Sequence, residues 1–245
     1  SEGKWKGNED LRKLLHGGMA WWYENMPVCR NWWHNQIGVP KKFAGILMML
    51  RNELTPEELE GGLRVLEKAK FGMTGQNKVW LAGNNLMRGL LINDEALVKE
   101  AAEQIKATIC VTDEEGIQRD WSFHQHGAQL QLGNYGLAYA ECVSFWMSIL
   151  KGSKYDFTPQ QKKIIGNLVK NGISRAVYNG TMDPSFCGRQ NFINAGRGKA
   201  HALAVIAQNL SVAFDGEADF YTRLSDEILQ PEKFANSRTG QNYYW

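Results

Sequence analysis

Residues 158–177 read TPQQKKIIGNLVKNGISRAV, and this stretch decides the fold class. Thr158 is a typical helix-capping residue, and Pro159 suits the first turn of a helix. Apolar side chains then recur at steps of three and four residues, which is the spacing of one buried helix face. The stripe consists of Ile164, Ile165, Leu168, Val169, Ile173, Ala176 and Val177. The stretch therefore predicts an amphipathic helix.

Most other apolar stretches have the same spacing, and strand-like alternation is weak. One helix opens at Thr55-Pro56-Glu57-Glu58, with a capping residue, a proline in the first turn and acids near the positive end of the helix dipole. Another is capped by Asn93-Asp94-Glu95 and runs to about residue 109. Further predicted helices span residues 9–25, 40–53, 78–91, 134–151, 196–210 and 217–229. Connections rich in Gly, Asn and Asp lie at residues 72–77, 111–134 and 179–195.

No Gly/Ser linker or block of charge divides the chain. We therefore expect one all-α domain over residues 1–245, built from paired antiparallel helices. Such pairs can stack as a solenoid or close into an α/α toroid, and no strict repeat decides between them. The last residues, Tyr243-Tyr244-Trp245, form an aromatic cluster that a soluble domain seldom leaves uncovered. We expect the chain to be a piece of a longer protein.

The composition narrows the class of partner. A net charge of +2 gives no electrostatic reason to expect a nucleic acid or a membrane surface, and no apolar run is long enough to span a bilayer. The four cysteines form no CxxC pair, which argues against a metal cluster. Nine Trp, ten Phe and eight Tyr suit either a large core or a sugar-binding surface, since indole rings can cover the C–H faces of sugars.

The connection DWSFHQHGAQLQLGNYG, residues 120–136, holds the main candidate site. His126 and Tyr135 are nine residues apart, and the glycines between and beside them allow a bend that brings the two together. A neutral imidazole beside a phenol can transfer protons. Two other interpretations stay open: a purely structural connection between helices, and a metal site formed by His124, His126 and Asp120.

Three further stretches carry residue types that bind ligands. Trp32 and Trp33 are adjacent, and neighbours on a helix point about 100° apart, so at least one should face solvent or a groove. Asn77 ends the glycine-rich turn FGMTGQN and offers either an amide for a ligand or a cap for the next helix. Arg189 and Arg197 lie beside glycines and suit a carboxylate or a sulfate.

These signals occur in a specific order along the chain. The motifs are NWWHNQIGVP at residues 31–40, TGQN at 74–77, SFHQHGAQLQLGNYG at 122–136 and Gly188-Arg189. Their order and spacing resemble the catalytic α-domain of polysaccharide lyase family 8, the family of chondroitin AC, hyaluronate and xanthan lyases. The resemblance runs from about Asn31 to Gln190. The nine-residue interval from His126 to Tyr135 resembles that of the branch with chondroitin AC, hyaluronate and xanthan lyases more than that of the chondroitin ABC branch.

The resemblance implies an incomplete α/α toroid that continues into β-sandwich domains, which this chain lacks. It implies that Asn77 holds the uronate carboxylate, and that His126 and Tyr135 transfer protons with the support of Arg189. The substrate-binding residues that we expect are Asn31, Trp32, Trp33, Phe71 and Arg197. Related lyases often carry a second arginine where this chain has Ile193, so Arg197 departs from the family pattern.

The implied reaction is β-elimination, in which a uronic acid loses its C5 proton and the glycosidic oxygen leaves from C4. We expect an acidic polysaccharide as the partner, no cofactor or metal, a monomer, and a secreted or periplasmic location that follows from the substrate class. One alternative is a glycoside hydrolase on an α/α toroid, which needs two opposed carboxylates. Its local candidates are Asp120 with Asp113, Glu114 or Glu115. Another alternative is a non-catalytic glycan-binding module that uses Trp32 and Trp33.

Overall fold

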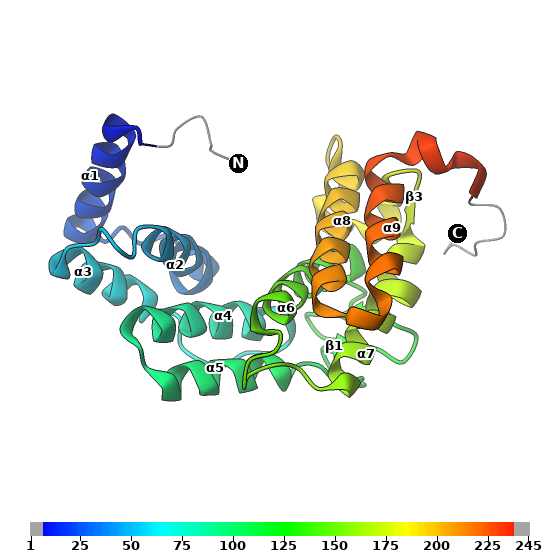
Figure 1. Cartoon of the computed structure of the whole chain (residues 1–245), viewed down its shortest axis with the longest axis horizontal. Helices are drawn as coiled ribbons and strands as arrows, with labels where there is room; N and C mark the ends of the chain where they lie inside the picture. The colour runs from blue at the N-terminus through cyan, green and yellow to red at the C-terminus, as the bar shows by residue number, and fades with distance from the viewer. Residues whose placement is uncertain (1–6, 238–245) are drawn as a thin grey trace. The chain divides into compact units, whose positions relative to one another are not determined.

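A computed structural model describes residues 7–237 of the chain (Figure 1). The aromatic end at Tyr243-Tyr244-Trp245 lies outside the described residues. The secondary structure of the described part is dominated by helices, as the apolar spacing predicted. The α-helices are α1 Glu9–Asn25, α2 Val39–Met49, α3 Pro56–Leu66, α4 Gly75–Ile92, α5 Glu95–Lys106, α6 Leu137–Leu150, α7 Pro159–Asn167, α8 Ala195–Ala213 and α9 Ala218–Leu229.

Short elements join these helices. Two hairpins of two-residue strands are present: β1 Gly116–Ile117 with β2 Phe123–His124, and β3 Val177–Tyr178 with β4 Thr181–Met182. The π-helical turns are His34–Gly38, Leu132–Gly136 and Leu168–Gly172. The 3₁₀ turns are Ile173–Ala176, Pro184–Phe186, Gly188–Gln190, Asp215–Glu217 and Pro231–Ser237. No helix within residues 7–237 is both long enough and apolar enough to cross a membrane.

The chain groups into two compact units. Unit 1 contains residues 1–72 and 80–101, and unit 2 contains residues 73–79 and 102–245. In unit 1 a first core packs α1, α2 and α3 around Phe43 and Leu47. A smaller cluster holds Ile37, Ala69 and Leu81, with the partly buried rings of Trp33 and Trp80 against it.

Unit 2 contains the predicted proton-transfer residues. Helix α8 packs against both α6 and α9, and Figure 1 shows α8 and α9 side by side. The helices bury fully enclosed side chains such as Met147, Leu203 and Tyr221. The four cysteines are free thiols: Cys29 and Cys110 are exposed, Cys142 is half-buried and Cys187 is buried.

The stretch at residues 158–177 begins as predicted and then departs from a single helix. Thr158 forms a complete capping box with Gln161, and α7 starts at Pro159. The helix changes to a π turn after Asn167, then to a 3₁₀ turn, and ends in β3. A side chain at Gly172 would collide with the backbone carbonyl of Trp121, so the glycine permits this close crossing. The apolar stripe is buried from Ile165 to Val177 as expected, and Ile164 is half-buried.

Two of the predicted connections contain more structure than expected. Residues 111–134 include the hairpin β1–β2, and residues 179–195 include β4 and two 3₁₀ turns. The turn expected at residues 72–77 ends earlier, because α4 begins at Gly75. Asn77 therefore lies in the first turn of α4 and is not the residue that caps it.

Candidate active site

The side chains of His126 and Tyr135 are in direct contact. His126 Nε2 and the Tyr135 hydroxyl share a hydrogen bond of 3.0 Å, and their rings meet edge to face with centroids 5.0 Å apart. His126 is exposed and Tyr135 is half-buried. Which atom donates depends on the imidazole tautomer. An accessible imidazole bonded to a phenol can pass a proton in either direction.

The local fold explains why these two side chains meet. Strand β2 ends two residues before His126, and its Phe123 is fully buried. Tyr135 lies in the π turn Leu132–Gly136, which leads into α6. The N–H of Gln131 donates to the Phe123 carbonyl at 2.8 Å, and a β-carbon at Gly136 would lie 2.7 Å from Phe123 Cβ. The π turn therefore lies directly against the strand that precedes His126.

The backbone of His126 has a left-handed conformation, with φ of 61°. This region is uncommon for a residue with a side chain and needs support from its surroundings. Gly127 follows with φ of 75°, a conformation that favours glycine. These two consecutive positions turn the chain back after β2.

The carboxylate of Glu115 accepts hydrogen bonds from three residues in two segments, namely this turn and the residue before α4. Its Oε1 accepts from the Gly127 N–H at 2.8 Å. Its Oε2 accepts from Thr74 Oγ1 and from Gln125 Nε2. Burial opposes the charge on Glu115, but these donors, the backbone N–H of His126 and the nearby imidazole outweigh it and lower the pKa of the Glu115 carboxyl.

Asn77 is attached to the same loop through its neighbours. The Gln76 N–H donates to Gln125 Oε1 at 3.0 Å, and Gly75, with φ of 51°, leaves room for that oxygen. Asn77 is buried, and among the described residues its Oδ1 accepts no hydrogen bond. Buried amide groups are nearly always satisfied within a structural core, so this oxygen is an acceptor available to a ligand hydroxyl, and donation to a carboxylate would come from Nδ2 of the same amide.

Arg189 lies in the exposed 3₁₀ turn Gly188–Gln190, beside the turn that carries Tyr135. Gly188 approaches Asn134 closely, since a β-carbon there would lie 2.9 Å from Asn134 Nδ2. On the other side, Gln190 Oε1 accepts from Lys199 Nζ at 2.9 Å. The structure thus places the backbone around Arg189 against the residue that precedes Tyr135. Arg197 is exposed in the first turn of α8.

Lys199 joins these two segments. Its buried ammonium donates to the carbonyl of Gly133, to Asn134 Oδ1 at 3.2 Å and to Gln190. Burial lowers the pKa of the Lys199 ammonium. No pattern in the sequence distinguished Lys199 or Gln125 as a site residue, and Glu115 was a candidate only as an acid of the alternative hydrolase. Their partners lie far along the chain, and residue types alone do not reveal such contacts.

The predicted sugar-binding tryptophans have different environments within unit 1. The Trp32 side chain is 43% exposed. Trp33 packs edge to face on Trp80, with ring centroids 5.4 Å apart. The prediction that at least one of the pair faces solvent is confirmed. Asn31 Oδ1 accepts from the Trp33 N–H at 3.0 Å, and Phe71 is half-buried.

The residues proposed as metal ligands have other partners. Asp120 accepts hydrogen bonds from Ser122, which together with the nearby His124 lower the pKa of the Asp120 carboxyl. His126 bonds to Tyr135. Within residues 7–237, no group of three or more His, Cys, Asp or Glu side chains is arranged to hold a metal ion.

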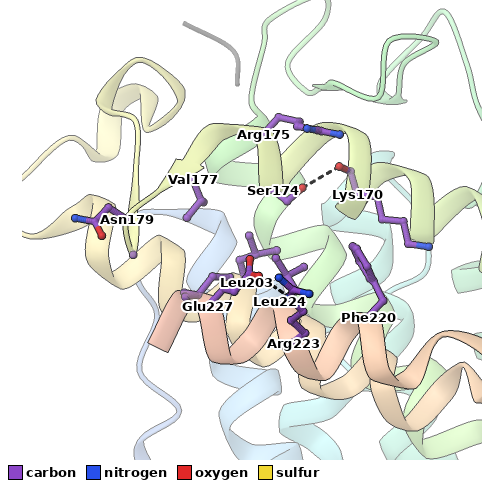
Figure 2. A pocket seen from close by; sticks show the side chains of 12 residues that line it. Lys170, Ser174, Arg175, Val177, Asn179, Leu203, Phe220, Arg223, Leu224 and Glu227 are labelled. Atoms are coloured by element: carbon purple, nitrogen blue, oxygen red, sulfur yellow. Dashed lines mark hydrogen bonds and ion pairs between the residues drawn. The ribbon is translucent and has the colours of Figure 1, made fainter. Parts of the chain in front are cut away.

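A separate pocket of about 400 Å³ lies between α9 and the segment that follows α7 (Figure 2). Two of its basic side chains, Lys170 and Arg223, have acidic or aromatic partners within the chain. Lys170 pairs with Glu217 at 2.6 Å and lies 4.7 Å from the centre of the Phe220 ring. Arg223 pairs with Glu227 at 2.8 Å. None of the residues predicted from the sequence to act in catalysis lines this pocket.

Comparisons with known proteins agree with the motif order. A family model described as polysaccharide lyase family 8, N-terminal alpha-helical domain, matches residues 1–230. Chondroitinase-AC of Pedobacter heparinus is 29% identical over 188 residues, which cover 75% of this chain and 27% of that protein. Hyaluronate lyase of Thermasporomyces composti is 27% identical over 187 residues, which cover 74% of this chain and 23% of that protein.

A solved structure is similar as well. Paenibacillus xanthan lyase superimposes with a TM-score of 0.84 at 24% sequence identity, covering 95% of this chain and 24% of the other. At this identity the likeness shows the fold, and it confirms the predicted all-α class. The chain spans about a quarter of the length of the curated relatives it matches.

Proposed function

This chain belongs to polysaccharide lyase family 8, and on that premise we propose that it acts in the β-elimination of uronic-acid-containing polysaccharides such as chondroitin or hyaluronan. The observation that carries the proposal is the 3.0 Å hydrogen bond between His126 and Tyr135. A proton-transfer pair at this spacing is what removal of a C5 proton requires. Asn77 and Arg189, attached to the same two segments, supply the remaining groups.

The chemistry assigns a task to each residue. The C5 proton of a uronic acid is weakly acidic until the charge of the adjacent carboxylate is neutralised. In our proposal the Asn77 amide donates to that carboxylate, and one such donor lowers the barrier by about 3 kcal/mol. A base then takes the C5 proton, the C4–O bond breaks, and the electron pair of the C5–H bond forms the C4=C5 double bond. An acid delivers a proton to the leaving oxygen.

We assign both proton transfers to Tyr135. His126 can accept the phenol proton through their shared hydrogen bond, which leaves a phenolate to attack C5–H. The protonated phenol then serves the leaving oxygen. The cationic Arg189, on the turn beside Asn134, favours the phenolate. In the competing assignment His126 is the base and Tyr135 is the acid.

The polymer-binding residues belong to this proposal too. The exposed Trp32 offers an indole face to the sugar chain. Trp33 supports the same segment from the core side. The set that we propose for substrate binding is Asn31, Trp32, Trp33, Phe71 and Arg197. A substrate of this class also implies a secreted or periplasmic protein, and we propose that it works as a monomer without a cofactor.

The surroundings of Glu115 argue against this residue as the general acid of a hydrolase. The general acid of a glycoside hydrolase needs a raised pKa and access to the leaving oxygen. The Glu115 carboxylate instead accepts from three donors, and its pKa is lowered. A group held in this way is a poor proton donor at neutral pH.

The products test the proposal. The protein at its natural length is incubated with chondroitin, hyaluronan and xanthan-type polymers, and ultraviolet absorbance reports the C4=C5 double bond. Tyr135→Phe should reduce turnover about a hundredfold or more while polymer binding persists. Tyr178→Phe, at an exposed tyrosine of β3, is the matched control and should keep full turnover. The proposal fails if no polymer yields an unsaturated product, or if Tyr135→Phe is as active as the control. A glycan-binding module would bind polymer but release no unsaturated product, with or without the Tyr135 hydroxyl.

A further inference from the structure

Glu115 joins two segments that carry or adjoin the proposed catalytic groups. Thr74, one residue before α4, donates to it from the segment that contains Asn77. Gln125 and Gly127 donate from the residues on either side of His126. Gln125 in turn accepts from the Gln76 N–H at 3.0 Å, so the side-chain network closes on itself.

The arrangement requires a carboxylate. A carboxylate presents two oxygens that only accept hydrogen bonds, and here both oxygens face donors. A glutamine would keep one acceptor and, in either orientation of its amide, turn an NH₂ group toward at least one of those donors. Among the described groups, His126 is the ionisable neighbour that acts on the Glu115 charge, through its imidazole and its backbone N–H. Glu114, the adjacent acid, is exposed and has none of these side-chain contacts in the described structure.

We infer that Glu115 is a positioning residue for the proposed reaction: it holds His126 in its left-handed conformation and fixes the start of α4 against the same loop. The inference rests on the proposed function. Glu115 acts through His126 and Asn77 and does not itself touch the substrate. Without the Glu115 carboxylate, the segments that carry the His126 imidazole and the Asn77 amide are no longer joined by its hydrogen bonds.

Glu115→Gln tests this role, with Glu114→Gln as the matched control. Displacement of a catalytic group by about 1 Å can cost a hundredfold, so we expect Glu115→Gln to lower kcat about a hundredfold, with KM little changed. In the background that lacks both His126 and Asn77 side chains (His126→Ala with Asn77→Ala), the same substitution should change kcat by no more than about twofold, because both groups through which Glu115 acts are gone. A purely structural role would lower activity in both backgrounds alike and would overturn the inference.

Amide hydrogen exchange gives a readout that does not need activity. In Glu115→Gln, exchange at residues 124–128 and 73–77 should rise about tenfold or more, and Glu114→Gln should leave both segments unchanged. Unchanged exchange in Glu115→Gln would overturn the inference whatever the activity. Raised exchange in a protein that cleaves none of the polymers would retain the attachment role of Glu115 and reject the lyase proposal, so the two failures are distinguishable.

Discussion

The charge of Glu115 is favoured by hydrogen-bond donors and by the nearby imidazole of His126. Burial opposes this charge, but the hydrogen bonds from Thr74 and from the backbone N–H groups of Gly127 and His126, with that imidazole, outweigh the cost of burial. Because its pKa is lowered in the fold, the folded state binds fewer protons at this site than the unfolded chain over a range of pH. Ionisation of Glu115 therefore stabilises the folded state.

We expect this contribution to disappear in acid. It is fully present above the ordinary glutamate pKa and is lost as the pH falls through the lower pKa of the folded state. The melting temperatures of wild type and Glu115→Gln should therefore differ most at neutral pH and converge in acid, where the protonated glutamic acid resembles glutamine. A pH series of thermal melts measures this, with Glu114→Gln close to wild type throughout. A difference that stays constant or widens in acid would contradict the prediction.

The residue types and their spacing predicted the contact between His126 and Tyr135, because glycines mark the bend that joins them. The role of Glu115 could not be predicted in this way. Thr74 lies 41 positions away along the chain, and a glutamate beside a second glutamate has no distinguishing pattern. The sequence pointed to it only as a candidate acid for hydrolysis. Such contacts follow from tertiary packing, which local patterns do not describe.

Among the elements, the π turn Leu132–Gly136 determines where Tyr135 lies. Its Gly133 passes so close to the carbonyl of Phe186 that a β-carbon would collide with it. The carbonyl oxygen of Gly133 itself accepts a hydrogen bond from the buried ammonium of Lys199. The turn is therefore fixed by close packing on one side and by a buried cation on the other.

Gly133→Ala should displace this turn. The added methyl group has to move the backbone of one segment or the other, which costs about 1–3 kcal/mol of unfolding free energy. Lyase activity should fall with it, because Tyr135 lies two residues away. Gly45→Ala in α2, where a β-carbon meets nothing within 4 Å, is the control and should gain roughly 0.5–1 kcal/mol. Urea unfolding measures both, and a fully stable, fully active Gly133→Ala would refute the packing argument.

Helix positions were predictable because capping residues and apolar stripes are local signals. The starts at Pro56 and Pro159 match the two Thr-Pro motifs, and Thr55 and Thr158 cap these helices as the sequence suggests. The π turns were not predictable. Such a turn holds one residue more than a turn of α-helix, and no particular residue type marks it in the sequence. The short strands were missed for a related reason: two residues are too few to establish an alternating pattern.

In the whole molecule, the proposed substrate platform and the proton-transfer pair belong to different compact units. Trp32 and Trp33 lie in unit 1, and His126 and Tyr135 lie in unit 2. Helices α4 and α5 contribute residues to both units. This continuity explains why the sequence contains no linker between them. The net charge of +2 leaves affinity for an acidic polymer to local groups.

Substitutions of Trp32 and Trp33 should separate polymer binding from the stability of unit 1. Trp32→Ala removes an exposed ring, so we expect a change in stability within about 0.5 kcal/mol. Polymer affinity should weaken about three- to tenfold, with kcat at saturation unchanged. Trp33→Ala removes a ring packed on Trp80 and should cost about 3 kcal/mol. Urea unfolding and the KM for polymer distinguish the two variants. An unchanged KM in Trp32→Ala would remove this tryptophan from the binding surface.

The exposed cysteines provide a means to measure the distance between the two units. Cys29 and Cys110 are exposed and lie in units 1 and 2 respectively, whereas Cys142 is half-buried and Cys187 is buried. Thiol reagents react with accessible thiols first. Brief treatment with a donor and an acceptor dye can therefore label one position in each unit, and energy transfer between the dyes then reports their separation with and without polymer. The native chain thus carries a pair of labelling sites suited to single-molecule spectroscopy.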